Sequence, residues 1–249
     1  MRTFHTFTYK DGNYRFCCPF PGIIQEEIRR QRTLLETYLT AHPAFLHSLT
    51  PVAPLTEAPE IARRMAAGSR KAGTGPMASI AGTIAQLSAE AAMQAGAEEA
   101  IIDNGGDLYL YSGNAVRVAL FSGTASFSGK LALKIEPAYM PAAVCSSSSK
   151  MGHSKSFGDC DLATVIADDA ALADAAATMA CNCVQKKEDI NRVLERTMSI
   201  RGIRGIIIIK DDRIGISGKI PEIVKIAKTI TNDALRKKII RDKNSVFLL

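Results

Sequence analysis

The residues with the clearest capacity for chemistry lie in an alanine-rich segment. Asp174 and Thr178 are four positions apart within 170–183, where most of their neighbours are alanine. This spacing places both side chains on one face of a helix, so a carboxylate and a hydroxyl would project from an apolar surface. Mg²⁺ prefers oxygen ligands and also recruits substrate phosphates, so the pair indicates a metal site. The alternative is a solvent-facing aspartate beside a threonine that bonds to its own helix backbone.

Two glycine-containing segments could bring the backbone close to a ligand. The basic segment Gly68–Gly75 precedes a helix predicted over Ala78–Ala95, and the free N–H groups at a helix start bind anions. Residues 104–107 read Asn-Gly-Gly-Asp at the end of a predicted strand. This second segment is either a ligand-binding turn or an ordinary tight turn, since Asn-Gly is common in hairpins.

A long loop of small residues is predicted over Ala142–Asp159. It contains the serines 146–149 and also His153, which lies between two lysines. His153 could orient a phosphate or act as an acid or base. A serine hydrolase is disfavoured because the chain has no G-x-S-x-G elbow. Asp159 and Asp161 could form a carboxylate pair, but neighbouring loop aspartates are more typical of solvated turns.

The six cysteines lack the C-x-x-C spacing of redox and zinc-ribbon motifs. We therefore expect reduced thiols, most of them buried. The alternative is a zinc site assembled from Cys145, His153, Cys160 and the pair Cys181 and Cys183, because metal ligands can converge from distant segments.

Charge and hydropathy limit the classes of partner. The chain has 31 Lys and Arg against 25 Asp and Glu in 249 residues, a net charge of +6, and Arg236–Lys243 contributes five basic residues against one aspartate. The rest is nearly balanced, so a nucleic-acid-binding face is not expected. No apolar run reaches the roughly 18 residues of a membrane span, and Met1–Lys10 lacks the apolar stretch of a signal peptide. We expect a cytoplasmic protein without a membrane partner.

The predicted elements alternate without a βαβ repeat, which indicates an α+β fold. A hairpin is expected over Thr3–Cys17 and an amphipathic helix over Gly22–Thr40. A helix is also expected over Pro221–Thr231. The isoleucine run 206–209 could form a core or a subunit contact, so the sequence is compatible with a homodimer. The further predicted strands are 100–104, 108–111, 116–121, 130–136, 162–167, 203–209 and 214–217, and the further helices are 61–67, 170–183 and 188–198.

The order of these motifs resembles the ApbE family. The glycine-rich entry to the helix at Ala78, the run Ile101–Asp107, the loop Val144–His153 and the segment Thr164–Thr178 follow one another as in that family. Its members are FAD-dependent FMN transferases with an α+β, T-fold-related architecture of antiparallel sheets and packed helices. They bind FAD and Mg²⁺, cleave the pyrophosphate of FAD and attach FMN to a threonine of a target protein. The resemblance covers roughly residues 70–185.

The resemblance implies a role for each motif. Asp174 and Thr178 match the Mg²⁺ ligands of the family motif A-D-A-x-x-T, and a main-chain oxygen from 75–82 would be the third ligand by analogy. Histidine 153 would be the catalytic residue and also a cofactor contact. The turn and serine positions implied to bind the flavin cofactor are Gly105, Gly106, Asp107, Ser146 and Ser147.

The chain departs from the family pattern at two places. The family run H-I-I-D-P-x-T-G after the histidine reads His-Ser-Lys-Ser-Phe-Gly-Asp here, and a family lysine-glycine step reads Ala81-Gly82. The resemblance therefore implies a divergent, Mg²⁺-dependent FAD-binding protein that transfers FMN to an acceptor protein or cleaves FAD. The alternative is a non-catalytic binding protein for a flavin, pterin or related ligand.

We expect one domain over residues 1–249. Its parts would be a divergent N-terminal part, 1–69, a motif-bearing core, 70–185, a C-terminal α/β part, 186–235, and a basic tail, 236–249.

Overall fold

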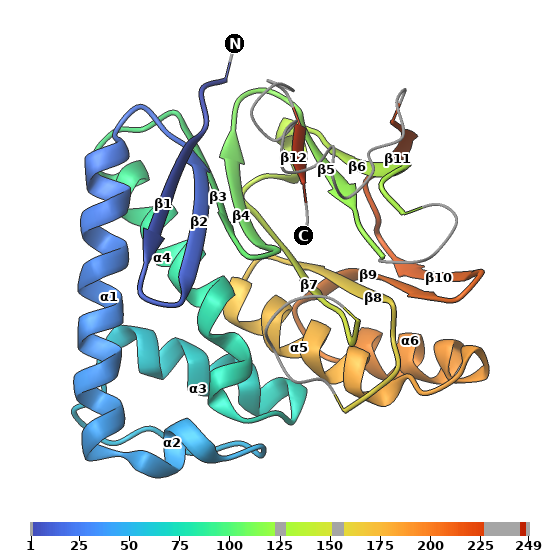
Figure 1. Ribbon diagram of the computed structural model, residues 1–249, viewed down its shortest axis with the longest axis horizontal. Coiled ribbons are helices and arrows are strands. Elements are labelled where there is room, and N and C mark those ends of the chain that lie inside the picture. The colour runs from blue at the N-terminus through green and yellow to red at the C-terminus, as the bar shows by residue number, and fades with distance from the viewer. Residues whose placement is uncertain (1, 123–127, 151–156, 227–244, 248–249) are drawn as a thin grey trace.

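The computed structural model describes residues 2–122, 128–150, 157–226 and 245–247. Helices cover one face of an eight-stranded sheet, and a four-stranded sheet packs on the opposite face (Figure 1). The mixture of helices and antiparallel strands confirms the predicted α+β class.

The large sheet is antiparallel throughout, in the order β1-β2-β3-β4-β7-β8-β9-β10. Its strands are β1 His5–Tyr9, β2 Gly12–Cys17, β3 Glu99–Asn104, β4 Asp107–Ser112, β7 Ala142–Ser147, β8 Leu162–Ala167, β9 Ile203–Lys210 and β10 Arg213–Gly218. The small sheet has the order β11-β6-β5-β12, with β12 parallel to β5. Its strands are β5 Val116–Leu120, β6 Leu131–Ile135, β11 Glu222–Lys225 and β12 Ser245–Phe247.

The helices cover one face of the large sheet, to the left of and below it in Figure 1. They are α1 Pro21–Ala41, α2 Pro43–His47, α3 Glu60–Ala72, α4 Ile80–Gln94, α5 Ala170–Cys183 and α6 Ile190–Met198, with short 3-10 turns η1 Pro76–Ser79, η2 Pro137–Tyr139 and η3 Lys187–Asp189. None of the helices in the described ranges is both long and apolar enough to cross a bilayer.

The isoleucines of β9 are covered on both faces of the large sheet, which forms the middle layer. Ile206 and Ile208 pack among the helices, whereas Ile207 and Ile209 pack against the small sheet, and all four are buried. Successive strand residues point to opposite faces, so a continuous apolar run suits a strand covered on both sides. The run therefore belongs to the core.

Glycines allow α5 to pack backbone to backbone against two other helices. A Cβ atom on Gly68 of α3 would lie 2.6 Å from the carbonyl oxygen of Ala171, and one on Gly82 of α4 would lie 2.5 Å from that of Ala170. Real Cβ atoms do not approach backbone so closely, so both positions require glycine. The close approach brings the start of α4 against the first turns of α5, where Asp174 lies.

Most predicted elements are confirmed, and two are wrong. Ala142–Ser147, expected to begin a loop, forms β7 between β4 and β8. Its small side chains lie beneath α5, and pairing on both sides outweighs their loop-like composition. The helix expected over Pro221–Thr231 is also wrong in its described part, because Glu222–Lys225 forms β11 against β6. The remainder of that helix and the basic tail lie outside the described residues, except for the three residues of β12.

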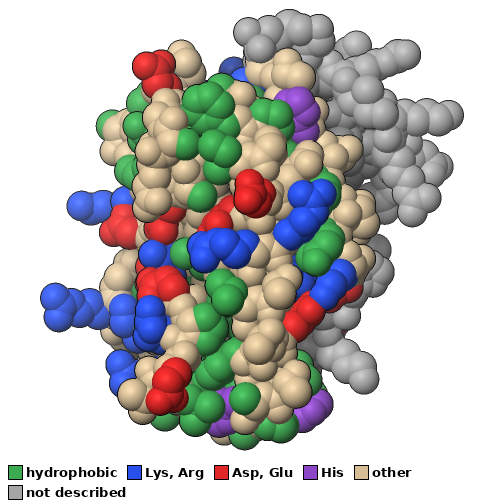
Figure 2. All heavy atoms as spheres, turned by 90° about the vertical axis from the view of Figure 1, so that its left-hand side faces the viewer, with side chains coloured by type: hydrophobic (Ala, Val, Ile, Leu, Met, Phe, Trp, Pro, Cys, Tyr) green, Lys and Arg blue, Asp and Glu red, His purple; other side chains and the backbone are tan. Residues whose placement is uncertain are grey.

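The face that carries α1 is charge-balanced. Lys and Arg are interspersed with Asp and Glu on it (Figure 2). Arg30 pairs with Glu27 at 2.6 Å, and Arg32 pairs with Asp11. Paired charges of this kind do not form a continuous basic surface.

Candidate functional site

A cavity of about 590 Å³ brings together residues from distant parts of the sequence. Asp107 comes from β4, Asp174 and Thr178 from α5, and Thr74 from the glycine-rich segment before η1. Both predicted metal ligands thus line the same cavity as the aspartate of the predicted flavin turn. The volume falls within the range of about 300–1,000 Å³ that is usual for small-molecule sites.

The side-chain carboxylate of Asp174, a residue of α5, lies at the N-terminal end of α4. Its Oδ2 accepts a hydrogen bond from the Gly82 N–H at 2.9 Å, and the Ala81 N–H also bonds to the carboxylate. The anion-binding helix start predicted from the sequence is therefore filled by a carboxylate of the same chain. Burial raises the pKa of Asp174 to about 7, and the two backbone hydrogen bonds act in the opposite direction.

Asp107 is the second buried carboxylate of the cavity. Its Oδ1 accepts a hydrogen bond from the Ser146 N–H at 3.3 Å. Burial, followed by the nearby charge of Asp174, raises the pKa of Asp107 well above its usual value. Burial and the same two carboxylates raise the pKa of the Cys145 thiol, which favours its neutral form. Two neighbouring buried carboxylates are costly to ionise together unless a cation neutralises them.

The turn between β3 and β4 sets the direction of Asp107. Gly105 and Gly106 have φ of +66° and +107°, and they connect the paired residues Asn104 and Asp107. The prediction that residues 104–107 form a tight hairpin turn is therefore confirmed. Of these four residues, only Asp107 lines the cavity. The Asn104 Nδ2 donates to the Ala81 carbonyl at 3.1 Å, which fixes the turn to α4.

A buried aspartate supports the same turn from within. The Gly106 N–H donates to Asp103 Oδ1 at 3.0 Å. Burial raises the pKa of Asp103 to about 6.

The donors in the cavity fit a hard cation. Asp107 and Asp174 supply carboxylate oxygens, and Thr178 supplies a hydroxyl. The described part of the chain contains no group of three or more His, Cys, Asp or Glu side chains placed to share a metal ion. A cation here would therefore complete its shell with main-chain oxygen, water or substrate phosphate, as Mg²⁺ commonly does.

Thr74 shows that the cavity contains unused hydrogen-bonding capacity. Its side chain is 7% exposed, and its Oγ1 has no hydrogen-bond partner among the described residues. The adjacent Gly75 packs so closely on residue 48 that a Cβ atom would lie 1.8 Å from the Ser48 carbonyl oxygen. A buried hydroxyl without a partner is unusual, and a ligand in the cavity would satisfy it.

Apolar side chains surround the mouth of the cavity. Leu46, Leu49 and Phe157 line it and are 41%, 69% and 64% exposed. Apolar side chains together with a few convergent polar groups are typical of sites that bind small molecules.

The predicted serine and histidine positions lie differently. The Ser146 backbone reaches Asp107, but the Ser146 Oγ pairs with Thr164 Oγ1 at 2.7 Å, and neither Ser146 nor Ser147 lines the cavity. His153 lies outside the described residues.

None of the six cysteines, all of which lie in the described ranges, forms a disulfide bond, and five are buried. Cys183 is half-buried and lines the cavity. Within the ranges that the structure describes, no group of three or more His, Cys, Asp or Glu side chains could hold a zinc ion, and His153 of the zinc alternative lies outside those ranges.

The segment that carries His153 is fastened at both ends. The Ser149 N–H donates to the Cys160 carbonyl at 2.9 Å, and the Cys160 N–H donates to Ser149 Oγ at 3.1 Å. Lys150 pairs with Asp161 at 2.6 Å, and Lys210 pairs with Asp159 at 3.0 Å. The prediction of solvated aspartates is therefore wrong for Asp161, whose side chain is 1% exposed, because Lys150 reaches it.

Sequence reasoning missed several residues of the cavity. Asn182 continues the four-residue spacing of Asp174 and Thr178, so a longer reading of the α5 pattern would have found it. Arg196 of α6 also lines the cavity, and nothing in its local sequence indicates that position.

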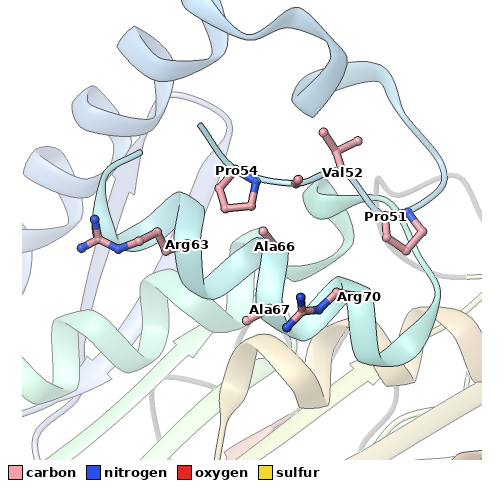
Figure 3. A pocket seen from close by; sticks show the side chains of 8 residues that line it. Pro51, Val52, Pro54, Arg63, Ala66, Ala67 and Arg70 are labelled. Atoms are coloured by element: carbon pink, nitrogen blue, oxygen red, sulfur yellow. The ribbon is translucent and has the colours of Figure 1, made fainter. Parts of the chain in front are cut away.

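A second cavity, of about 350 Å³, lies between α3 and residues 51–54 (Figure 3). It contains none of the predicted site residues. Arg63, which lines it, donates to the Ala58 carbonyl at 2.7 Å and pairs with Glu60 at 2.8 Å. The lining is otherwise apolar apart from Arg70, so this cavity lacks the convergent polar groups of the first one.

Comparison with known proteins identifies the family of this chain. The family model described as AbpE bacteria matches residues 22–215. The UPF0280 protein MJ1526 of Methanocaldococcus jannaschii is 41% identical over 212 residues, 83% of this chain and 86% of that protein. A UPF0280 protein of Methanosarcina acetivorans is 40% identical over 202 residues, 81% of this chain and 79% of that protein.

Two solved structures share the fold at low sequence identity. The apo flavinyl transferase ApbE of Pseudomonas stutzeri matches with a TM-score of 0.55 at 12% identity, over 87% of this chain and 94% of that one. The ApbE protein of Thermotoga maritima matches with a TM-score of 0.55 at 13% identity, over 87% and 97%. The chain therefore belongs to the AbpE bacteria family and has the fold of the ApbE flavin transferases.

Proposed function

We propose that the cavity binds FAD together with Mg²⁺ and that the protein cleaves the FAD pyrophosphate, releasing AMP and passing FMN to a hydroxyl acceptor. The observation that carries this proposal is the pair of buried carboxylates, Asp107 and Asp174, in one cavity beside the Thr178 hydroxyl. Such a pair is stabilised in its ionised form by a cation, and the family fold favours a flavin nucleotide as the ligand.

The chain's own residues would divide the work. Asp107, Asp174 and Thr178 would hold the cation, and the Gly82 N–H fixes the orientation of Asp174. Bound Mg²⁺ supplies neutralisation of the charge that develops on the cleaved pyrophosphate. The Thr74 hydroxyl would bond to the ligand, and the apolar mouth would exclude water from the ring.

The reaction breaks one phosphoanhydride bond. The acceptor oxygen forms a new bond to the phosphorus of the FMN half, AMP leaves, and the proton of the acceptor hydroxyl passes to a base. His153 is the proposed base by family resemblance. The acceptor is a threonine of a partner protein or, in simple cleavage, water. The cytoplasm is the proposed location.

The experiment that tests the proposal incubates the purified protein with FAD, with and without Mg²⁺, and separates the nucleotides by chromatography while the visible spectrum of the protein is recorded. Mg²⁺-dependent appearance of AMP and FMN, abolished in Asp174→Asn, is the expected result. Asp212→Asn, in the β9–β10 turn, is the matched control.

Two other results would change the conclusion. Bound but intact FAD would favour a binding protein for a flavin or related ligand. Absence of both binding and cleavage would remove flavin from the proposal and leave only the fold.

A further inference from the structure

The charges in the cavity are separated along its length. Asp107 and Asp174 are its acidic residues, and Arg196 is the only Lys or Arg among the described residues that line it. Arg196 lies in the last turn of α6. Its Nη1 donates to the Cys183 Sγ at 3.4 Å, and no carboxylate of the described chain forms an ion pair with it. Within the described ranges, the Arg196 side chain therefore has no ion-pair partner at the wall of the site.

One face of α5 connects the two charged ends. Asp174, Thr178 and Asn182 line the cavity at four-residue intervals. A helix rises 1.5 Å per residue, so the eight positions from Asp174 to Asn182 span about 12 Å. Cys183 follows directly and contacts Arg196. A ligand lying along this face would meet the carboxylates at one end and the guanidinium near the other.

The neighbouring arginine of α6 provides a contrast. Arg192 lies one turn earlier, where it pairs with Asp189 at 2.9 Å and donates to the Cys183 carbonyl at 3.4 Å. It does not line the cavity. Through these contacts, Arg192 fastens α6 to the end of α5. Among the residues that the structure describes, the Arg196 side chain makes only the weak contact to the Cys183 sulfur. Most of its five N–H donors are therefore left for water or for a ligand.

We propose that Arg196 binds a phosphate oxygen of the ligand and thereby selects phosphorylated molecules for this cavity. Arg196 is exposed at the wall of the cavity, and its guanidinium presents paired N–H donors that match the oxygens of a phosphate. This inference rests on the proposed function for the location of the ligand, but not for its flavin ring. Arg196 is a binding residue in this scheme.

Binding measurements with matched ligands test the inference. Dissociation constants of FAD, inorganic pyrophosphate and riboflavin are measured by calorimetry in the presence of Mg²⁺, for wild-type protein and for Arg196→Ala, Arg196→Lys and Arg192→Ala. We expect Arg196→Ala to weaken FAD and pyrophosphate at least tenfold and to leave riboflavin, which lacks phosphate, unchanged. Arg196→Lys should recover part of the loss, and Arg192→Ala should bind as the wild type does.

Cys183 gives a second readout that needs no turnover. It is half-buried, whereas the other five cysteines are buried, and it touches Arg196. Alkylation of the wild-type protein by iodoacetamide, located by mass spectrometry, should therefore slow severalfold at Cys183 when pyrophosphate is bound. An unchanged rate at saturating pyrophosphate would place the phosphate elsewhere and overturn the inference.

The outcomes separate this inference from the proposed function. Wild-type binding of FAD with equal affinity in Arg196→Ala overturns the role of Arg196 and leaves the flavin proposal standing. Equal losses in Arg192→Ala and Arg196→Ala, or an equal loss for riboflavin, also overturn it, because they indicate a disturbed helix. Arg196-dependent binding of pyrophosphate without any binding of FAD supports the phosphate site and removes the flavin.

Discussion

Replacement of Asp174 by asparagine should stabilise the metal-free protein at alkaline pH. The pKa of Asp174 is raised from 3.8 to about 7, mainly by burial. Between these values the folded protein keeps a proton that the unfolded chain has lost, so the free energy of unfolding falls as pH rises through this window. A shift of this size corresponds to roughly 4 kcal/mol above pH 7, at about 1.36 kcal/mol per pKa unit.

Asparagine has the same shape, carries no charge and still accepts a hydrogen bond from Gly82. That bond is weaker without the charge, by about 1 kcal/mol. We therefore expect the difference in unfolding free energy between Asp174→Asn and the wild type to shift in favour of the variant by about 2–3 kcal/mol from pH 5 to pH 8. The assay is urea denaturation in EDTA at both values, with Asp212→Asn as the control that should show no such pH-dependent gain.

At pH 8, Mg²⁺ should reverse the order of stability and make the wild type more stable than Asp174→Asn. A cation that binds only the folded wild type adds stability that grows with its concentration, and the variant has lost one carboxylate ligand. An equal difference in unfolding free energy between wild type and Asp174→Asn at pH 5 and pH 8 would refute the reasoning, because it would show that Asp174 is not held against a costly ionisation.

Three further substitutions test the packing and the site. Gly82→Ala should lose about 1–3 kcal/mol of stability in thermal denaturation, since its Cβ atom would clash with the α5 backbone. The control Gly22→Ala, with open space at its Cβ, should be nearly neutral. Equal effects of the two substitutions would contradict the close helix contact. Thr178→Val should keep the melting temperature within a few degrees and lose Mg²⁺-dependent FAD cleavage; unchanged cleavage would exclude Thr178 as a ligand. Asp169→Ala should cost about 1 kcal/mol in urea denaturation, because its side chain accepts the Leu172 N–H at the start of α5; no loss would contradict the capping role.

The sequence could predict the helix of the site because its pattern is local. The positions of Asp174 and Thr178 on one face follow from helical spacing, and the structure places both in one cavity with Asp107. The strand pairs around them also follow from local alternation and turn residues, as at Gly105 and Gly106. These features depend on neighbours in the sequence.

The remaining features depend on contacts between distant segments. Ser146 and its neighbours have the composition of a loop, but β7 forms because β4 and β8 pair with it on either side. Arg196 reaches the cavity only because α6 lies against the end of α5, and the α4 start is closed by Asp174 only because Gly82 allows the helices to touch. No local pattern in the sequence encodes these approaches.

The fastening of residues 149 and 160 to each other has a consequence for how this family can diversify. The hydrogen bonds between Ser149 and Cys160, with the ion pair of Lys150 and Asp161, fix the two ends of the intervening stretch independently of what lies between them. Sequence drift within that stretch therefore need not disturb the register between β7 and β8. A relative's segment could therefore be grafted between the same anchors while the carboxylate face of α5 is retained.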